Sequence, residues 1–230
     1  MFPVPSVVSF KNKKPIRSFV RREGRLTSGQ QRALTELWPR YGINACDAAI
    51  NMDAAFQRQA PKVLEIGFGN GESLARTAAE HPEIDFVGIE VHRPGVGHLL
   101  HLLEKDNIEN VRVICDDASD VIERNIADQS LQQISIFFPD PWPKKRHHKR
   151  RLIQTPFVTL LSTKLSSQGV LHIATDWEDY AEWIEEVMQT IDSYSKTIID
   201  CALPRLNTKY ERRGLRRGHQ VWDLVYCLKD

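Results

Sequence analysis

The chain has 230 residues, of which 41% are hydrophobic and 27% are charged, a composition typical of a folded globular protein and not of a disordered one. No apolar run reaches the roughly 18 residues that a membrane-spanning helix needs, so we expect no membrane partner. The first basic residues follow the N-terminal apolar stretch instead of preceding it, which predicts no secretory signal and a cytoplasmic protein. The four cysteines show no CxxC spacing, and we expect no metal site.

The net charge is only +1, but the positive charge is concentrated in three segments. Residues 1–26 carry +6, residues 144–151 carry +6 and residues 205–217 carry +5, which leaves −16 on the rest of the chain. Three basic segments on an acidic body favour a polyanion partner, such as a nucleic acid, that touches part of the surface. The alternative is that each segment is a solvated loop.

Residues 1–30 show no hydrophobic periodicity, and we expect a basic N-terminal arm that only a partner orders. Helical spacing follows at Leu34, Leu37 and Trp38 and stops at Pro39. Further on, short β-branched or aromatic runs alternate with helical segments. The predicted strands are Lys62–Ile66, Phe86–Glu90, Val111–Cys115, Ile134–Phe138, Val170–Thr175, Thr197–Cys201 and Gln220–Leu228. The predicted helices lie near 71–80, 95–105, 118–126, 156–166 and 177–192.

The alternation of strands and helices predicts right-handed βαβ units, a mostly parallel sheet and the α/β fold class. We find no internal repeat and no linker, so we expect one domain, residues 31–230, preceded by the arm. Ligands of such sheets bind beyond the carboxyl ends of the strands. The residues that follow each predicted strand are therefore the candidates for a site.

The first predicted strand leads into the sequence LEIGFGNGE, in which Gly67, Gly69 and Gly71 permit a tight turn and close approach of a ligand. A dinucleotide-binding loop would have glycine or alanine where this chain has Glu72, and a carboxylate there opposes a bound pyrophosphate. With Glu65 as a further acid before it, the loop favours a cationic ligand without phosphates. S-adenosylmethionine fits, because it carries an ammonium and a sulfonium.

Acids also follow the next two predicted strands. Glu90 lies 19 residues beyond Gly71, about where an acid binds both ribose hydroxyls of a nucleotide. Asp116 or Asp117, after the third strand, can accept a hydrogen bond from the amine of an adenine, and the sequence does not decide between them. A helix cap or a solvated turn explains each acid alone, but three acids after three successive strands favour a ligand site.

The fourth predicted strand leads into PDPWP, in which Pro139 and Pro141 restrict the backbone on both sides of Asp140. We therefore expect a stiff loop that presents Asp140 at the ligand end of the sheet. The basic segment 144–151 follows at once, so chemistry and polyanion contact would be neighbours. Trp142 is either a stacking surface for a base or a packing residue of the loop.

Five segments, LEIGFGNG, GIEVHRPGVG, FFPDPWPKKRHHKRR, ATDW and TKYERRGLRRGHQVWDL, closely resemble the bacterial tRNA (guanine-N7-)-methyltransferases, and FVRREGRLTSGQ is similar too. The resemblance runs from about Ser18 to the end of the chain. It implies a Rossmann-like, seven-stranded class I methyltransferase fold and S-adenosylmethionine as the cofactor. It also implies methylation of N7 of a guanine in the tRNA variable loop.

The resemblance implies roles for individual residues as well. Asp140 is the implied catalytic residue. The implied cofactor site consists of Glu65, Gly67, Gly69, Glu90, Asp117 and Asp140. The implied substrate-binding residues are Lys144, Asp176, Thr208, Lys209, Tyr210 and Glu211. The implied RNA contacts are Arg146, His147, His148, Lys149, Arg150 and Arg151.

Several alternatives stay open at this point. Guanine N7 has a lone pair and no proton, so we favour electrostatic stabilisation by Asp140 over general-base catalysis. Asp176 either accepts hydrogen bonds from guanine or caps the helix that follows it. The whole protein is alternatively a methyltransferase for another RNA base, a protein or a small molecule, or a non-catalytic RNA-binding module. We expect a monomer, with a homodimer as the alternative.

Overall fold

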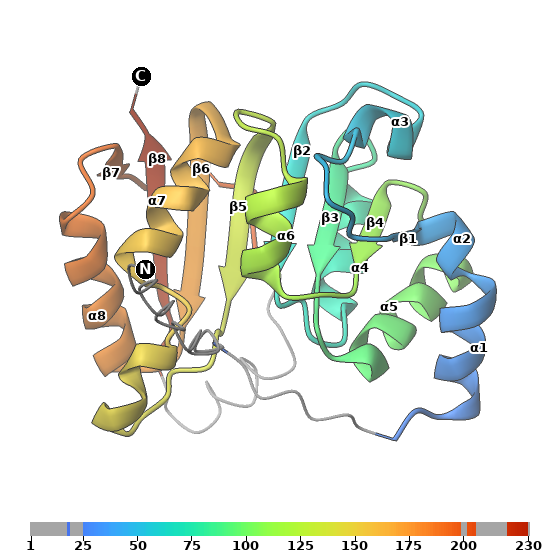
Figure 1. The fold of residues 1–230 in the computed structure, drawn as a ribbon, viewed down its shortest axis with the longest axis horizontal. Helices are drawn as coiled ribbons and strands as arrows, with labels where there is room; N and C mark the ends of the chain where they lie inside the picture. Colours follow the sequence, from blue (N-terminus) through green and yellow to red (C-terminus); the bar gives the residue numbers. More distant parts are fainter. Residues whose placement is uncertain (1–17, 19–24, 199–201, 206–219, 230) are drawn as a thin grey trace, which may run out of the picture.

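The computed structural model describes residues 18, 25–198, 202–205 and 220–229. Within these residues, one eight-stranded sheet runs through the molecule and carries helices on both faces (Figure 1). The strands are β1 Gly42–Ile43, β2 Lys62–Ile66, β3 Asp85–Ile89, β4 Val111–Ile114, β5 Leu131–Phe137, β6 Leu165–Thr175, β7 Tyr194–Lys196 and β8 Trp222–Leu228. The helices are α1 Ser28–Glu36, α2 Trp38–Tyr41, α3 Met52–Phe56, α4 Glu72–Glu80, α5 Arg93–Lys105, α6 Ala118–Asn125, the 3₁₀ helix η1 Lys145–Arg150, α7 Thr155–Lys164 and α8 Glu178–Gln189.

The strand order in the sheet is β1-β4-β3-β2-β5-β6-β8-β7. The neighbours from β1 to β6 run parallel, whereas β8 is antiparallel to β6 and β7 is antiparallel to β8. The strands from β2 to β8 correspond in number and sequence order to the seven predicted strands. The α/β fold class and the Rossmann-like sheet expected from the sequence are therefore confirmed.

Two strands differ from the sequence prediction. The strand predicted at Thr197–Cys201 is wrong in position, because β7 spans Tyr194–Lys196 and residues 199–201 lie outside the described residues. The adjacent β-branched residues Thr197 and Ile198 suggested a strand that begins later in the chain. In the structure, the buried ring of Tyr194 faces the core whereas Ile198 is 67% exposed. The additional strand β1 has only two residues, Gly42–Ile43, and so short an element shows no alternation that could predict it.

The N-terminal helix begins earlier than the sequence prediction places it. Thr27 forms a capping box with Gln30, in which each side chain accepts a hydrogen bond from the other residue's backbone N–H. Pro39 lies in the first turn of α2, where a missing N–H costs nothing, and therefore opens a second helix. The domain boundary predicted at residue 30 falls inside α1, and most of the predicted arm lies outside the described residues.

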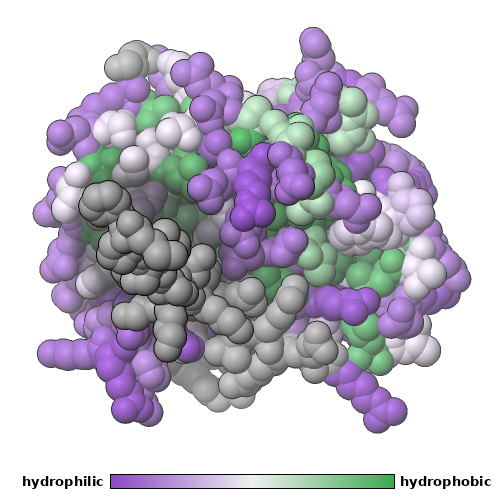
Figure 2. Space-filling view, in the orientation of Figure 1, coloured by the Kyte–Doolittle hydropathy of each residue, from purple (hydrophilic) through white to green (hydrophobic). Residues whose placement is uncertain are grey.

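Two large apolar cores, one on each face of the sheet, hold the layers together, and a small third cluster consists of Val170, Ala202 and Val225. Helices α3, α6, α7 and α8 cover one face, and α1, α2, α4 and α5 cover the other face over β2, β3 and β4. The second face is different over β5 and β6, where Gln133, Ser135 and His172 are buried polar residues that alternate with apolar ones. In the coloured part of Figure 2, hydrophilic side chains surround smaller hydrophobic patches.

Candidate active site

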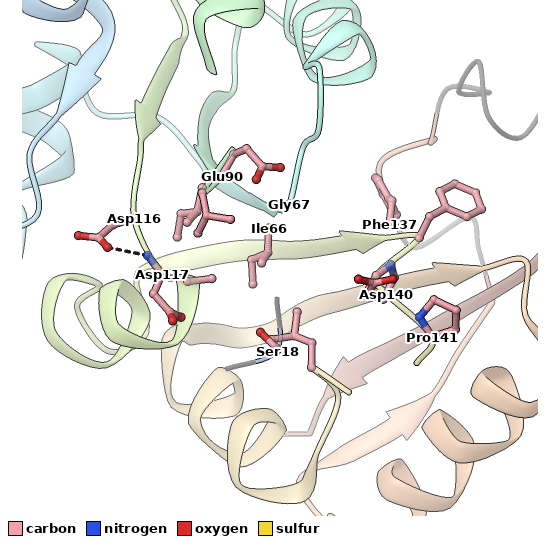
Figure 3. Close-up of a pocket in the computed structure, with 15 residues that line it drawn as sticks. Ser18, Ile66, Gly67, Glu90, Asp116, Asp117, Phe137, Asp140 and Pro141 are labelled. Carbon is pink, nitrogen blue, oxygen red and sulfur yellow. Dashed lines mark hydrogen bonds between the residues drawn. The ribbon is translucent and has the colours of Figure 1, made fainter. Parts of the chain in front are cut away.

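A cavity of about 290 Å³ opens beyond the carboxyl ends of β2, β3, β4 and β5. This is the edge of a parallel sheet at which ligands of this fold class bind. Figure 3 shows its lining, to which Glu90, Asp116, Asp117 and Asp140 each contribute a carboxylate. The remaining described lining residues are Ser18, Ile66, Gly67, Ile89, Val91, Ala118, Phe137, Phe138, Pro139, Pro141 and Leu152. The described lining thus combines four acids with apolar groups and includes no lysine or arginine.

The glycine loop after β2 takes a backbone path that requires glycine. Gly67, Gly69 and Gly71 have φ angles of +75°, +62° and +76°, a region that other residues rarely adopt. A β-carbon on Gly71 would also lie 2.6 Å from the side chain of Leu99 in α5. The Gly95 position in the same helix is equally constrained, because a β-carbon there would lie 2.0 Å from the Gly69 carbonyl oxygen. The glycines of both sequence motifs therefore bring the loop against the start of α5.

Glu90, directly after β3, ties this loop to the next strand. Its carboxylate accepts the backbone N–H of Gly69 at 3.0 Å and that of His92 at 2.8 Å. Each carboxylate oxygen can accept a second hydrogen bond, so both can still bind a ligand hydroxyl. Glu90 is therefore held in place at the cavity wall, as the predicted ribose role requires.

Asp116 and Asp117 both line the cavity after β4. Asp117 caps α6 by accepting the Ser119 N–H at 3.0 Å. Asp116 accepts the backbone N–H of Asp117 at 2.8 Å, as the dashed line in Figure 3 marks. The structure brings both carboxylates to the site, and the sequence's ambiguity between them persists.

Glu65 lies apart from the other acids. It is 8% exposed in the middle of the sheet, between Gly88 and Ser135, and is not among the residues that line the cavity. Desolvation by burial raises the pKa of its carboxyl to about 7. A cation bound nearby would stabilise the ionised form of this carboxyl. The predicted cofactor role of Glu65 stays a prediction.

The loop that carries Asp140 is built from strained and anchored residues. Phe138 and Trp142, on either side of Asp140, have φ angles of +52° and +46°. The N–H of Phe138 donates to the Ala174 carbonyl at 2.8 Å, which continues the pairing of β5 with β6 beyond the strand. Arg151 donates from Nε to the Pro141 carbonyl at 3.0 Å. Asp140 itself is exposed at the cavity mouth, so the loop is fixed while its acid stays accessible.

Trp142 is engaged by neighbours in the structure. Its Nε1 donates to the Ser18 carbonyl at 3.1 Å, the Arg150 guanidinium lies 4.8 Å from its ring centroid, and the His147 ring packs edge-on. Of the two interpretations of Trp142, the contacts favour the packing role. They also bring Ser18 of the predicted arm to the cavity, which the sequence did not indicate.

The basic segment after this loop divides into exposed and buried side chains. Lys144, Lys145, Arg146 and Lys149 are exposed on and before η1. The sequence predicts RNA contact for Arg151 too, but the structure buries this residue to 2% exposure. Its guanidinium pairs with Asp179 and lies 4.9 Å from the Tyr180 ring centroid. Arg151 is therefore the anchor of η1; its burial disfavours the RNA contact, which stays a prediction for this side chain.

The two histidines of η1 differ from the exposed cations. His148 packs edge-on against Trp183, and its Nε2 lies 3.2 Å from the Arg151 guanidinium. Desolvation, together with Arg146 and the other nearby cations, lowers the pKa of His147. His147 therefore adds less positive charge to the surface near neutral pH than the lysines do, and His148 is packed against its neighbours.

Two further predicted substrate positions have different outcomes. Asp176 is exposed directly after β6, and Trp177, not Asp176, is the N-cap residue of α8. The helix-cap interpretation of Asp176 is thus wrong, which leaves its carboxylate available at the ligand edge. Thr208, Lys209, Tyr210 and Glu211 lie outside the described residues.

None of the helices among the described residues has the length and apolar character needed to cross a membrane. The described residues contain no group of three or more His, Cys, Asp or Glu side chains arranged to hold a metal ion.

The sequences of known proteins identify the family. A family model described as "Putative methyltransferase" matches residues 59–224. A protein of Alkalilimnicola ehrlichii is 56% identical over 220 residues, which cover 93% of this chain and 93% of that protein. A protein of Nitrosococcus oceani is 54% identical over 214 residues, covering 93% of this chain and 91% of its own. Both relatives are named tRNA (guanine-N(7)-)-methyltransferase.

Solved structures agree on the fold. The 16S rRNA methyltransferase KamB superposes with a TM-score of 0.55 at 13% identity, covering 77% of this chain and 94% of its own. An rRNA methylase from Streptococcus thermophilus superposes with a TM-score of 0.52 at 14% identity, covering 74% of this chain and 88% of its own. At such low identities the likeness concerns the fold alone. The sequence relatives, which span nearly the whole chain, place this protein in the tRNA (guanine-N(7)-)-methyltransferase family.

Proposed function

We propose that the protein transfers a methyl group from S-adenosylmethionine to N7 of a guanine in the variable loop of tRNA. The observation that carries this proposal is the cavity in which four carboxylates meet and which no described cation lines. Such a cavity favours a cationic ligand without phosphates and opposes a dinucleotide. The family names, which specify tRNA and guanine N7, supply the substrate.

The residues of the cavity fit the parts of this cofactor. Glu90 has acceptor capacity left for the two ribose hydroxyls, and Asp116 or Asp117 accepts from the adenine amine. Glu65 does not line the cavity, but burial raises the pKa of its carboxyl, and the ammonium group of the cofactor would favour its ionised form. The apolar lining residues cover the uncharged parts of the adenosine.

We assign the chemical step to Asp140, which lines the cavity mouth. When bound, the cofactor would supply a methyl group attached to a sulfonium. The lone pair of guanine N7 would form the N–CH3 bond as the S–CH3 bond breaks, and the sulfonium would become a neutral thioether. The purine gains a positive charge in this displacement, and guanine N7 has no proton to remove. A fixed carboxylate near N7 stabilises that charge, and the anchored loop keeps it in place before reaction.

The tRNA would lie along the exposed cations next to this loop. Lys144, Lys145, Arg146 and Lys149 are close to Asp140 in the chain and can neutralise phosphates, which gives affinity without base specificity. Asp176, with an available carboxylate, can accept from the N1–H and the amine of the target guanine. We assign Thr208 to Glu211 to substrate binding on the family resemblance. A protein that modifies tRNA is expected in the cytoplasm, and we propose a monomer as the working state.

The proposal is tested by incubating the protein with labelled S-adenosylmethionine and tRNA that lacks the modification, followed by nucleoside analysis. We expect 7-methylguanosine as the labelled product. Label in another nucleoside would assign the protein to another base. Tight tRNA binding without any transfer would favour the non-catalytic RNA-binding module.

A further inference from the structure

A buried ionic network lies beneath the Asp140 loop and has no part in the chemistry described above. The Arg205 guanidinium donates from Nε to Oδ1 of Asp223 and from a terminal nitrogen to Oδ2, each at 2.9 Å. His172 places Nε2 2.9 Å from the same Oδ1. Since an ionised carboxylate only accepts, this His172 nitrogen carries the proton.

The network is costly to bury, which argues against a purely stabilising role. The His172 side chain is 0% exposed and that of Arg205 is 5% exposed, whereas that of Asp223 is 21% exposed. Burial raises the pKa of Asp223, but hydrogen bonds from His172 and Arg205 outweigh it and hold the pKa far below its usual range. Apolar residues of similar volume often stabilise a fold as well as a buried ion pair does. The charged groups therefore suggest a geometric task.

The arginine and the histidine of this network contact the two phenylalanines that precede Asp140. The Arg205 guanidinium lies 5.2 Å from the ring centroid of Phe138 and 5.8 Å from that of Phe137. The His172 ring packs edge-on against Phe137 at 5.0 Å. Both phenylalanines line the cavity, and Figure 3 shows Phe137 at the end of the strand that leads to Asp140.

The same network joins the neighbouring strands to this loop. Asp223 of β8 pairs in register with Ala174 of β6, whose carbonyl accepts the Phe138 N–H. Arg205 lies three residues before Thr208, the first residue of the segment that the family resemblance assigns to substrate binding. The Asp223 carboxylate thus holds Arg205, and Arg205 in turn contacts Phe138, whose φ angle is positive and which precedes Asp140.

We propose that Arg205, held by Asp223 and His172, is a positioning residue that fixes the Phe137–Phe138 pair and thereby the Asp140 carboxylate for methyl transfer. The guanidinium is suited to this task because its planar fork binds the carboxylate through two bonds while its face covers the aromatic rings. A lysine at this position would keep the positive charge, but it has no planar group that could bind both carboxylate oxygens and cover the aromatic rings. This inference rests on the proposed function of Asp140.

The test measures single-turnover methyl transfer to tRNA at saturating tRNA and cofactor, which isolates the step that Asp140 serves. We expect Arg205→Lys to slow this step by roughly 10- to 100-fold, the effect of a small misplacement of a catalytic group. In an Asp140→Asn background the same Arg205→Lys change should cause no further loss, because the group that it positions is already disabled. A merely structural role would slow both backgrounds alike.

Arg58→Lys is the matched control, because Arg58 also binds a buried carboxylate, that of Asp85, from Nε at 2.7 Å. Asp85 begins β3, at the end of the sheet away from the cavity, so this control should keep the wild-type rate. Arg205→Lys at the wild-type rate, or an equal loss in both Asp140 backgrounds, would overturn the inference while the proposed function stands. A wild-type protein that forms no 7-methylguanosine would overturn the proposed function and this inference with it.

Discussion

The carboxylate of Glu90 accepts the backbone N–H of Gly69 at 3.0 Å, across 21 residues of sequence. This hydrogen bond joins the end of β3 to the glycine loop after β2, in which Gly69 adopts a φ of +62°. The loop and the acid therefore form one preorganised wall of the cavity. Preorganisation of this kind lowers the entropy cost of binding a nucleoside there.

Replacement of Glu90 should weaken cofactor binding. We expect Glu90→Ala to raise the free energy of S-adenosylmethionine binding by about 1–3 kcal/mol, because both the ligand and the glycine loop lose the carboxylate as a hydrogen-bond acceptor. Isothermal titration calorimetry measures the change. Glu104→Ala, which removes an exposed glutamate from the far end of α5, is the control and should bind normally. Equal affinity of Glu90→Ala and wild type would remove Glu90 from the site.

Arg150 and Arg151 should have separable effects although they are adjacent. Arg150 is partly exposed over Trp142, so Arg150→Ala should weaken tRNA binding and reduce the salt slope by about 1. Its folding stability should stay near that of wild type. Filter binding of tRNA at several salt concentrations measures this effect.

Arg151 is buried against Asp179, Tyr180 and Trp183, so Arg151→Ala should lower the free energy of unfolding by about 1–3 kcal/mol. Its salt slope should be unchanged, because the guanidinium is buried and paired with Asp179. Thermal or urea unfolding measures the loss. An Arg151 variant of normal stability with a flattened salt slope would show that this side chain contacts RNA after all.

Glu65 should make stability depend on pH. Its pKa is about 7 in the folded protein against an ordinary 4.5, so below pH 4.5 it is protonated in both states. As the pH rises toward 7 the unfolded chain ionises first, and the free energy of unfolding falls, by about 3 kcal/mol in the limit above pH 7. Glu65→Gln should remove this fall, as measured by urea unfolding at several pH values between 4 and 8. A wild type and a Glu65→Gln variant with parallel pH profiles would contradict the raised pKa.

The sequence predicted local structure best where a residue type strongly favours one backbone conformation. The glycines at 67, 69 and 71 predicted a turn after a strand, and all three have a positive φ angle. Strand β2 was predicted with its observed bounds, because all five of its residues are buried in a central strand. The short strand β1 and helix α3 escaped, since two and five residues carry no period that can be read.

The candidate site was predicted in part. The acids after β3, β4 and β5 meet as expected, because parallel strands end at one edge. The burial of Arg151 was not foreseen, because its neighbours in sequence are solvated cations and its partner Asp179 comes from a distant helix. The contacts of Arg205 with Asp223 and Phe138 escaped for the same reason, since they join three separate parts of the chain.

The most direct measurement is a single-turnover assay of the wild type and Asp140→Asn on tRNA that lacks the modification, with nucleoside analysis of the product. We expect the wild type to form 7-methylguanosine. Asp140→Asn keeps the shape of the side chain and one acceptor oxygen but loses the charge, so we expect the rate to fall by about 100-fold or more. Formation of 7-methylguanosine by Asp140→Asn at the wild-type rate would contradict charge stabilisation by Asp140.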